Sequence, residues 1–192
     1  MDRTNTVMNF RQVAQSIRVP AGFALAPLLL IAARPTPTTL IVGAMVAAVG
    51  LAIRAWASGY LKKDMELATA GPYAHTRNPL YLGTFLLGVG VSVGSGAVWF
   101  VALFMALYLL IYVPVMQAEV ASVRRLFPQE YDDYARRVPL FLPRLMPYRT
   151  SSDDKQFDTS LYMRHREYRA AIGAALVFAI LAAKYYLHTQ QT

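Results

Sequence analysis

Long apolar stretches constrain this chain more than any other feature of its sequence. They run over residues 17–33, 38–58, 80–94, 97–115 and 168–187. A helix needs roughly 20 apolar residues to cross the hydrocarbon core of a bilayer, and these stretches approach or reach that length. Hydrophobic residues make up 56% of the 192 residues and charged residues only 16%, which is too apolar for an ordinary soluble domain. The pattern therefore predicts an all-α, polytopic membrane protein, with about five transmembrane helices in a single membrane domain over residues 1–192.

The third stretch is short and rich in glycine. Glycine is tolerated in membrane helices because it lets neighbouring backbones approach closely. Gly90 and Gly94 have the small-xxx-small spacing of packed membrane helices. We expect this helix to pack closely on a neighbour, although lipid-facing glycines would fit the sequence equally well.

The sequence also excludes several kinds of site. It has no cysteine, so disulfides, thiolate catalysis and cysteine metal sites are excluded. His75, His165 and His188 are scattered without metal-ligand spacing, and we expect no metal site. The first apolar stretch follows a polar lead without a small-residue cleavage pattern, so we expect it to remain in the protein rather than to be removed as a signal peptide.

Basic residues gather at one end of each predicted helix, and only Arg34 and Lys184 lie near the opposite ends. The positive-inside rule then predicts that the N-terminus and the segments 59–79 and 116–143 are cytoplasmic, followed by a linker over 144–167 and a C-terminus on the opposite side. A net charge of +8 suits anionic lipid headgroups, and we expect no nucleic-acid partner. Since the turns at 34–37 and 95–96 are short, any active site is expected in the cytoplasmic segments.

Two prolines punctuate the first cytoplasmic segment. Gly71-Pro72 predicts a turn, and Pro79 suits the first turn of the next helix, where its missing N–H is no loss. The helix start after Arg77 and Asn78 offers free backbone donors and a partial positive charge. These features favour an anionic group such as a carboxylate.

Glu119 is the unusual residue of the second cytoplasmic segment. It lies at the end of an apolar stretch that contains no other acid, where an unpaired carboxylate would be costly. It needs a cation, and either a ligand or a nearby arginine such as Arg124 or Arg125 could supply one.

Two ordered motifs carry a family resemblance. The first is Gly71-Pro72-Tyr73-x-x-x-Arg77-Asn78-Pro79-x-Tyr81, and the second is Glu119 followed by Leu126-Phe127-x-x-Glu130-Tyr131-x-x-Tyr134-x-x-x-Val138-Pro139. Separated by a predicted helical hairpin, they resemble the isoprenylcysteine carboxyl methyltransferase and phospholipid methyltransferase superfamily over about residues 60–143. The resemblance implies a helical membrane enzyme that transfers a methyl group from S-adenosylmethionine to a lipid or lipophilic acceptor.

The resemblance also implies the site residues. Glu119 matches the acid that engages the amino group of the cofactor, Arg77 matches the motif arginine, and we expect both to be catalytic. The other implied cofactor-binding positions are a strand-like stretch, Met65, Glu66, Leu67 and Ala68, and a turn, Tyr73, Asn78, Pro79, Leu80 and Tyr81. Family members commonly carry His in place of Asn78 and Glu in place of Val120. In the isoprenylcysteine enzymes an arginine that helps to hold the substrate stands at the position of Val115.

Methyl transfer from a sulfonium is an in-line displacement of an already activated group, so positioning at roughly 3 to 3.5 Å is the main task of the protein. We expect Tyr73 or Tyr81 to cover the adenine or the sulfonium, with a cation–π contact to the latter. A carboxylate or thiolate acceptor needs no general base. An amine acceptor must first lose a proton, for which His75 is the candidate base.

Two other classes of function fit parts of the sequence. A non-catalytic membrane scaffold or anionic-lipid-binding protein would use the arginines and keep a vestigial methyltransferase-like turn, but it has no need for Glu119. A transporter is less favoured, because the sequence shows no internal repeat or pair of broken helices.

Overall fold

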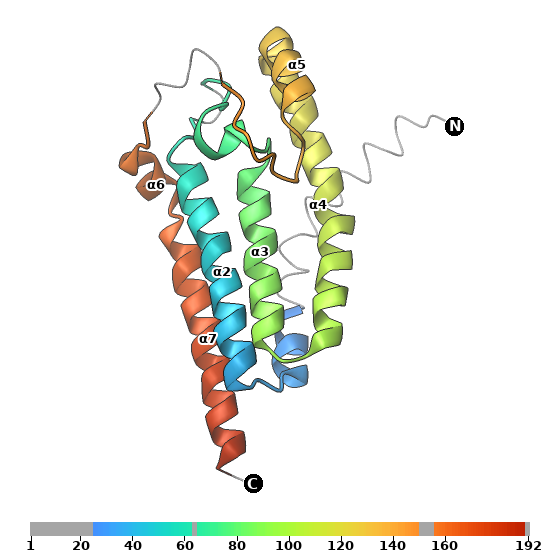
Figure 1. The fold of residues 1–192 in the computed structure, drawn as a ribbon, viewed down its shortest axis with the longest axis vertical. Helices are drawn as coiled ribbons and strands as arrows, with labels where there is room; N and C mark the ends of the chain where they lie inside the picture. The colour runs from blue at the N-terminus through green and yellow to red at the C-terminus, as the bar shows by residue number, and fades with distance from the viewer. Residues whose placement is uncertain (1–24, 63–64, 150–155, 191–192) are drawn as a thin grey trace, which may run out of the picture.

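The computed structural model describes residues 25–62, 65–149 and 156–190. Their regular elements are all helical, and they follow the order α2 (Pro37–Ser58), η1 (Gly71–Ala74), α3 (Pro79–Gly94), α4 (Val98–Leu126), α5 (Pro128–Arg137), α6 (Thr159–His165) and α7 (Tyr168–Thr189). Residues 25–32 form a further helical segment. The long helices run side by side in one bundle (Figure 1), which confirms the all-α prediction.

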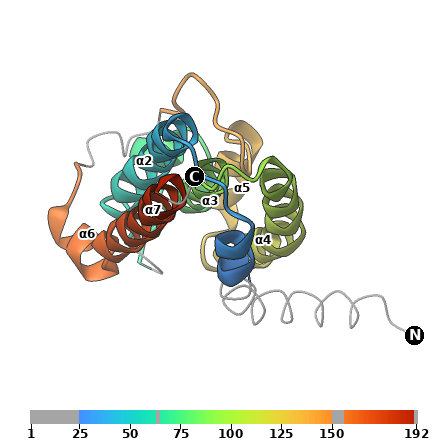
Figure 2. The same ribbon diagram turned by 90° about the horizontal axis from the view of Figure 1, so that it is seen from below.

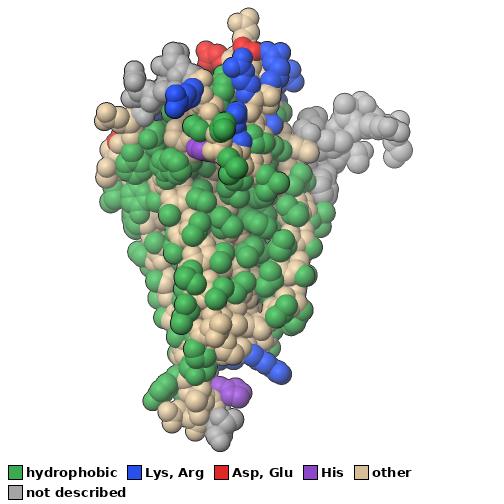
Figure 3. All heavy atoms as spheres, viewed as in Figure 1, with side chains coloured by type: hydrophobic (Ala, Val, Ile, Leu, Met, Phe, Trp, Pro, Cys, Tyr) green, Lys and Arg blue, Asp and Glu red, His purple; other side chains and the backbone are tan. Residues whose placement is uncertain are grey.

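The bundle has the surface of a membrane protein. In the described part of the chain, α2, α4 and α7 are long and apolar enough to cross a membrane, and α3 is apolar but shorter. Hydrophobic side chains cover the sides of the bundle, whereas most of the visible Lys and Arg side chains gather at one end (Figure 3). The predicted membrane character is confirmed. Of the first predicted helix, residues 17–24 lie outside the described residues.

The two ends of the bundle differ in composition. At the end we call the site end, α2 finishes, α3 begins, and η1, α5 and α6 lie (Figure 1). The opposite, far end carries the turns at 34–37 and 95–96. Seen along the bundle, α3 lies between α2 and α4, and α7 lies beside α2 (Figure 2).

Glycines let α2 and α3 pack closely. A Cβ added to Gly43 would lie 2.5 Å from the Gly90 carbonyl oxygen and 2.5 Å from the Gly94 nitrogen, and one added to Gly50 would lie 2.6 Å from the Gly83 carbonyl oxygen. Such distances leave no room for a side chain between the helices. The close packing predicted from Gly90 and Gly94 is confirmed.

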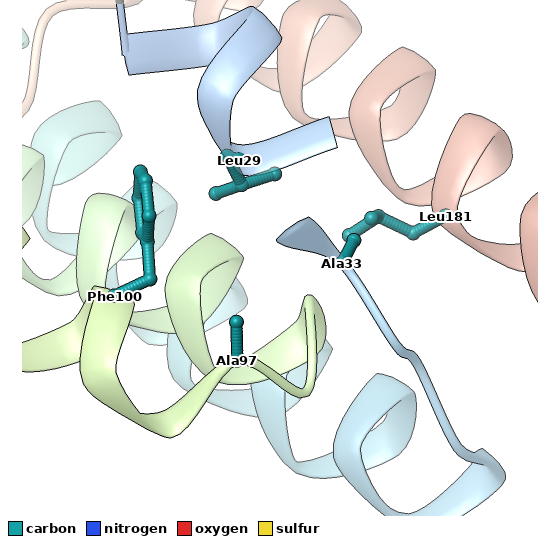
Figure 4. Close-up of a cluster of buried hydrophobic side chains, with 5 residues drawn as sticks. All are labelled: Leu29, Ala33, Ala97, Phe100 and Leu181. Atoms are coloured by element: carbon teal, nitrogen blue, oxygen red, sulfur yellow. The ribbon is translucent and has the colours of Figure 1, made fainter. Parts of the chain in front are cut away.

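A second contact closes the far end. The Arg34 N–H donates to the Ser95 carbonyl at 2.7 Å, and Gly96 takes the positive φ of 73° that this turn requires. Above the turns, one cluster of buried side chains joins the 25–32 segment, α4 and α7, and it consists of Leu29, Ala33, Ala97, Phe100 and Leu181 (Figure 4). Both predicted hairpin turns are therefore present.

One predicted helix boundary was wrong. The fourth helix, predicted over 97–115, continues to Leu126 with Pro114 inside it. Proline is tolerated within membrane helices, and most of the residues that follow it are good helix formers. Glu119 consequently lies within α4, about two turns before its end. The predicted linker 144–167 also contains a helix, α6, while its polar stretch 151–155 lies outside the described residues.

Candidate functional site

At the site end, the first sequence motif docks on residues 139–148, which begin at the last residue of the second motif. Three backbone hydrogen bonds join them, from Arg77 to Pro139 at 3.0 Å, from Arg144 to His75 at 2.9 Å and from Tyr148 to Ala74 at 2.9 Å. Two side chains add to this seam: the Asn78 amide nitrogen donates to the Leu140 carbonyl at 2.9 Å, and the Thr76 hydroxyl donates to the Phe141 carbonyl at 2.9 Å. The turn after α2 and the segment after α5 thus form one unit.

This unit borders a cavity of about 560 Å³, a size typical of small-molecule sites. Among the residues that line it are nine of the ten predicted cofactor-binding positions, Glu66, Leu67, Ala68, Tyr73, Asn78, Pro79, Leu80, Tyr81 and Glu119, together with Arg77. The tenth position, Met65, is not among the lining residues and is 78% exposed.

The predicted strand-like stretch 65–68 was wrong as a description of the backbone. Residues 65–66 form a turn and a bend, and residues 67–69 have no regular structure. A strand needs a neighbouring backbone with which to form a ladder. The segment after α5 bonds to residues 74–77 instead of 65–68. Glu66, Leu67 and Ala68 still reach the cavity from this irregular stretch.

Tyr73 lies where the short helix η1 meets the cavity. Its ring is buried, and its carbonyl accepts a 2.6 Å hydrogen bond from the Tyr134 hydroxyl. Burial, and then the nearby carboxylate of Glu119, raise the pKa of the Tyr73 phenol. The phenol is therefore neutral at physiological pH, and it can donate a hydrogen bond within the cavity.

Glu119 lines the cavity as an exposed acid on α4. Among the described residues it forms no ion pair. Arg124, one of the two arginines suggested as its partner from the sequence, instead pairs with Asp132 of α5 at 2.8 Å. A carboxylate of this kind at a membrane helix end is suited to a cationic ligand.

Arg77 approaches the same cavity from the turn. Its Nη1 donates to the Tyr131 hydroxyl at 2.8 Å, whereas its Nε is buried and has no partner among the described residues. An arginine whose donors are incompletely bonded is suited to an anion, because a buried donor without a partner is unfavourable. The cavity therefore presents one carboxylate, that of Glu119, and one guanidinium, that of Arg77, that are still able to bond to a ligand.

His75 does not share this environment. Its Nδ1 lies 2.8 Å from the Arg144 carbonyl, its ring packs against Trp56, and it is not among the residues that line the cavity. In this structure His75 belongs to the contact between the first motif and residues 139–148. The suggestion that it acts as a base stays a prediction without a geometric basis in the structure.

One wall of the cavity was not predicted from the sequence. Val120, Val123, Leu126 and Phe127 line it from the second half of α4 and the turn after it. With Glu119 they recur at the three- and four-residue spacing of one helix face. Extending the helical periodicity past Pro114 would have predicted this wall.

Comparison with known proteins shows similarity to metal resistance proteins. The chain is 38% identical over 117 residues to the nickel-cobalt-cadmium resistance protein NccN of Alcaligenes xylosoxydans xylosoxydans, and 35% identical over 144 residues to the cobalt-zinc-cadmium resistance protein CzcN of Cupriavidus metallidurans. These alignments cover 60% and 70% of this chain and 53% and 65% of the two relatives. No solved structure matches the chain significantly.

The family match covers the region that builds most of the cavity. Residues 38–130 match the phospholipid methyltransferase family. They include α2 from its second residue, the segment 59–78 between α2 and α3, which we call the cofactor turn, and the whole of α3 and α4. The match over residues 38–130 confirms the resemblance to the isoprenylcysteine carboxyl methyltransferase and phospholipid methyltransferase superfamily.

Proposed function

We propose that this protein is a membrane methyltransferase that uses S-adenosylmethionine to methylate a lipid or lipophilic acceptor. The observation that carries the proposal is the pair Glu119 and Arg77. Both side chains line one cavity of about 560 Å³, and neither is fully bonded within the described structure. S-adenosylmethionine carries an ammonium and a carboxylate on one short chain, so an unpaired acid and an unpaired arginine complement it.

The residues of the cavity divide the recognition between them. Glu119 would hold the ammonium, and Arg77 would hold the carboxylate or the acceptor. The first N–H groups of a helix have no partner within it, and Asn78 makes no side-chain cap on α3. The start of α3 therefore favours an anionic group beside Arg77. The rings of Tyr73 and Tyr81 would cover the adenine or the sulfonium.

When bound, S-adenosylmethionine supplies an activated methyl group. The contribution of the chain is then to hold the donor and the acceptor in line. Val115, Val120 and Val123 line the α4 side and would exclude water from it. The acceptor group that we propose is a carboxylate, an amine or a thiol of a lipid or lipophilic molecule. Both relatives are named as metal resistance proteins, so we propose resistance as the setting of this methyl transfer.

Calorimetric titration of S-adenosylhomocysteine into the detergent-purified protein tests the proposal. We expect saturable binding by the wild type, and binding weaker by about 10- to 100-fold in Glu119→Gln and Arg77→Gln, because each loses a charge-assisted hydrogen bond. Asp133→Asn is the matched control, since Asp133 is an exposed acid paired with Arg136 on the surface of α5. A folded wild type that does not bind would contradict the proposal and favour the non-catalytic scaffold.

We further propose that the site end faces the cytoplasm, with the N-terminus on that side and the C-terminus on the other. The support is the gathering of basic side chains at the site end (Figure 3). Because the chain has no cysteine, single cysteines report the orientation directly. In intact cells, a membrane-impermeant maleimide should label Thr38→Cys at the far end and leave Gln129→Cys unlabelled, and the reverse pattern would contradict this orientation.

A further inference from the structure

The C-terminal helix α7 is joined to the bundle by an ion pair near the site end. Arg54 of α2 bonds to Glu167, the residue before α7, through two nitrogens at once: Nε donates to Oε2 and Nη2 donates to Oε1, both at 3.0 Å. The pair is largely shielded, with side-chain exposures of 21% for Arg54 and 11% for Glu167. Glu167 lies outside the region that matches the phospholipid methyltransferase family.

The same arginine reaches the helix that carries the cofactor turn. Its Nη1 donates to the Thr84 hydroxyl and to the Leu80 carbonyl, the latter at 3.5 Å. Leu80 lines the cavity, and its carbonyl belongs to the first turn of α3. Arg54 thus connects α7 to the first turn of α3 without lining the cavity itself.

A second contact reaches the other end of the cofactor turn. The Asp158 N–H donates to the Gly59 carbonyl at 3.0 Å, and the ring of Phe157 packs edge-on against Tyr60 at 6.3 Å. Tyr60 in turn covers Gly71, where an added Cβ would lie 2.8 Å from its ring. The segment around α6 therefore supports the start of the turn, and Glu167 supports its end.

We propose that Arg54 and Glu167 are positioning residues of the methyltransferase site, and that α6 and α7 brace the cofactor turn through them. The proposal rests on the proposed function. A turn held at both ends keeps its cavity-lining residues in place before a ligand arrives, so less ordering is needed on binding. Removal of one support should then weaken cofactor binding even though no contact to the cofactor is lost.

The opposite end of α7 supplies a matched control. Lys184 donates from Nζ to the Leu30 carbonyl at 2.6 Å and to the Ile31 carbonyl at 3.2 Å, which ties the far end of α7 to the 25–32 segment. Lys184→Ala removes the polar tie at the far end of α7, and Glu167→Gln weakens the tie at the site end by removing its negative charge and one acceptor oxygen.

The experiment compares the thermal unfolding midpoint and the dissociation constant of S-adenosylhomocysteine in both variants. We expect both variants to lower the midpoint, and only Glu167→Gln to raise the dissociation constant, by about 3- to 30-fold. Arg54→Lys serves as a second variant that keeps the charge opposite Glu167. A single ammonium cannot reproduce the fork that reaches Glu167 and Leu80 together, so we expect weaker cofactor binding with a smaller loss of midpoint.

The outcomes separate the two proposals. If the wild type binds and Glu167→Gln and Arg54→Lys bind as tightly as Lys184→Ala, the positioning role is overturned and the methyltransferase site stands. If the folded wild type does not bind at all, the proposed function fails, and the positioning role fails with it.

Discussion

Two sets of charged side chains lie at the site end, and they differ in how they are satisfied. Arg54 and Glu167 satisfy each other, and Arg54 also bonds to Thr84 and to the Leu80 carbonyl. Among the described residues, the Arg77 side chain hydrogen-bonds only to Tyr131, and its buried Nε has no partner. Glu119 has no ion pair among the same residues.

The surroundings of the two sets explain the difference. Arg54 and Glu167 lie where α2, α3 and α7 pack together, and the contact of α2 with α3 is close enough to exclude side chains at its glycines. Arg77 and Glu119 border an open cavity. Charge near a membrane is costly without a partner. Charged side chains that pair with each other within the protein stabilise the fold. Charged side chains that border a cavity and lack partners indicate a ligand.

The largest expected effect comes from breaking the satisfied pair. Arg54→Met leaves the shielded carboxylate of Glu167 without a cation and removes the bonds to α3. We expect the free energy of unfolding to fall by about 3 kcal/mol, the lower end of the range for buried pairs because this pair is partly exposed. Denaturant titration in micelles measures it. A loss below about 1 kcal/mol would show that the pair behaves as an ordinary surface salt bridge.

Removal of both charges should cost less than removal of one. In the double variant Arg54→Met/Glu167→Met no uncompensated charge remains, and apolar replacements of buried ion pairs are often close to neutral. We expect a loss of about 1 to 2 kcal/mol, which arises from the missing bonds to Thr84 and Leu80. Additive losses in a double-mutant cycle would contradict the coupling of the two residues.

A neutral hydrogen bond near the unsatisfied set should matter less. Tyr134→Phe removes the 2.6 Å bond to the Tyr73 carbonyl and leaves that buried acceptor without this donor. We expect a loss of about 1 kcal/mol in the free energy of unfolding. Tyr186→Phe on the exposed face of α7 is the control, since its ring is 63% exposed. Equal losses of free energy of unfolding in the two variants would show that the hydrogen bond of the Tyr134 hydroxyl does not stabilise the fold.

The smallest expected effect on stability is that of Glu119→Gln. Because Glu119 has no ion pair in the described structure, its charge contributes little to the fold. We expect a change within about 0.5 kcal/mol without ligand, together with the weakened S-adenosylhomocysteine binding described above. A loss as large as that of Arg54→Met would reveal a structural partner for Glu119 and would break the contrast between the two sets.

The sequence predicts the long helices well, because apolar length is a local property. The stretches 38–58, 80–94 and 168–187 correspond to α2, α3 and α7 to within two residues. The prediction failed for α4, because the boundary was placed where the apolar residues end, whereas helical hydrogen bonds continue into water as long as the residues favour them. Apolar length therefore locates a membrane helix better than it locates the end of that helix.

The candidate site shows the same division between local and distant information. The family resemblance implied ten of the residues that line the cavity, since the motifs that carry it are continuous stretches of sequence. The Arg54–Glu167 pair joins residues 113 positions apart, and no periodicity or motif connects them. Contacts of this kind follow from packing of whole helices, and only the structure reveals them.

The contact between Arg34 and Ser95 at the far end has a mechanical consequence. It adds to the close contact of α2 with α3 in fixing the two helical hairpins to each other, and the buried cluster of Leu29 and Phe100 reinforces the far end. At the other end, α3 and α4 are separated by the cavity. Since α4 forms one wall of the cavity, a change in its tilt would widen or narrow the cavity. Since tilting is one way in which a membrane helix accommodates a mismatch with bilayer thickness, we expect the thickness of the host membrane to tune access to the cavity.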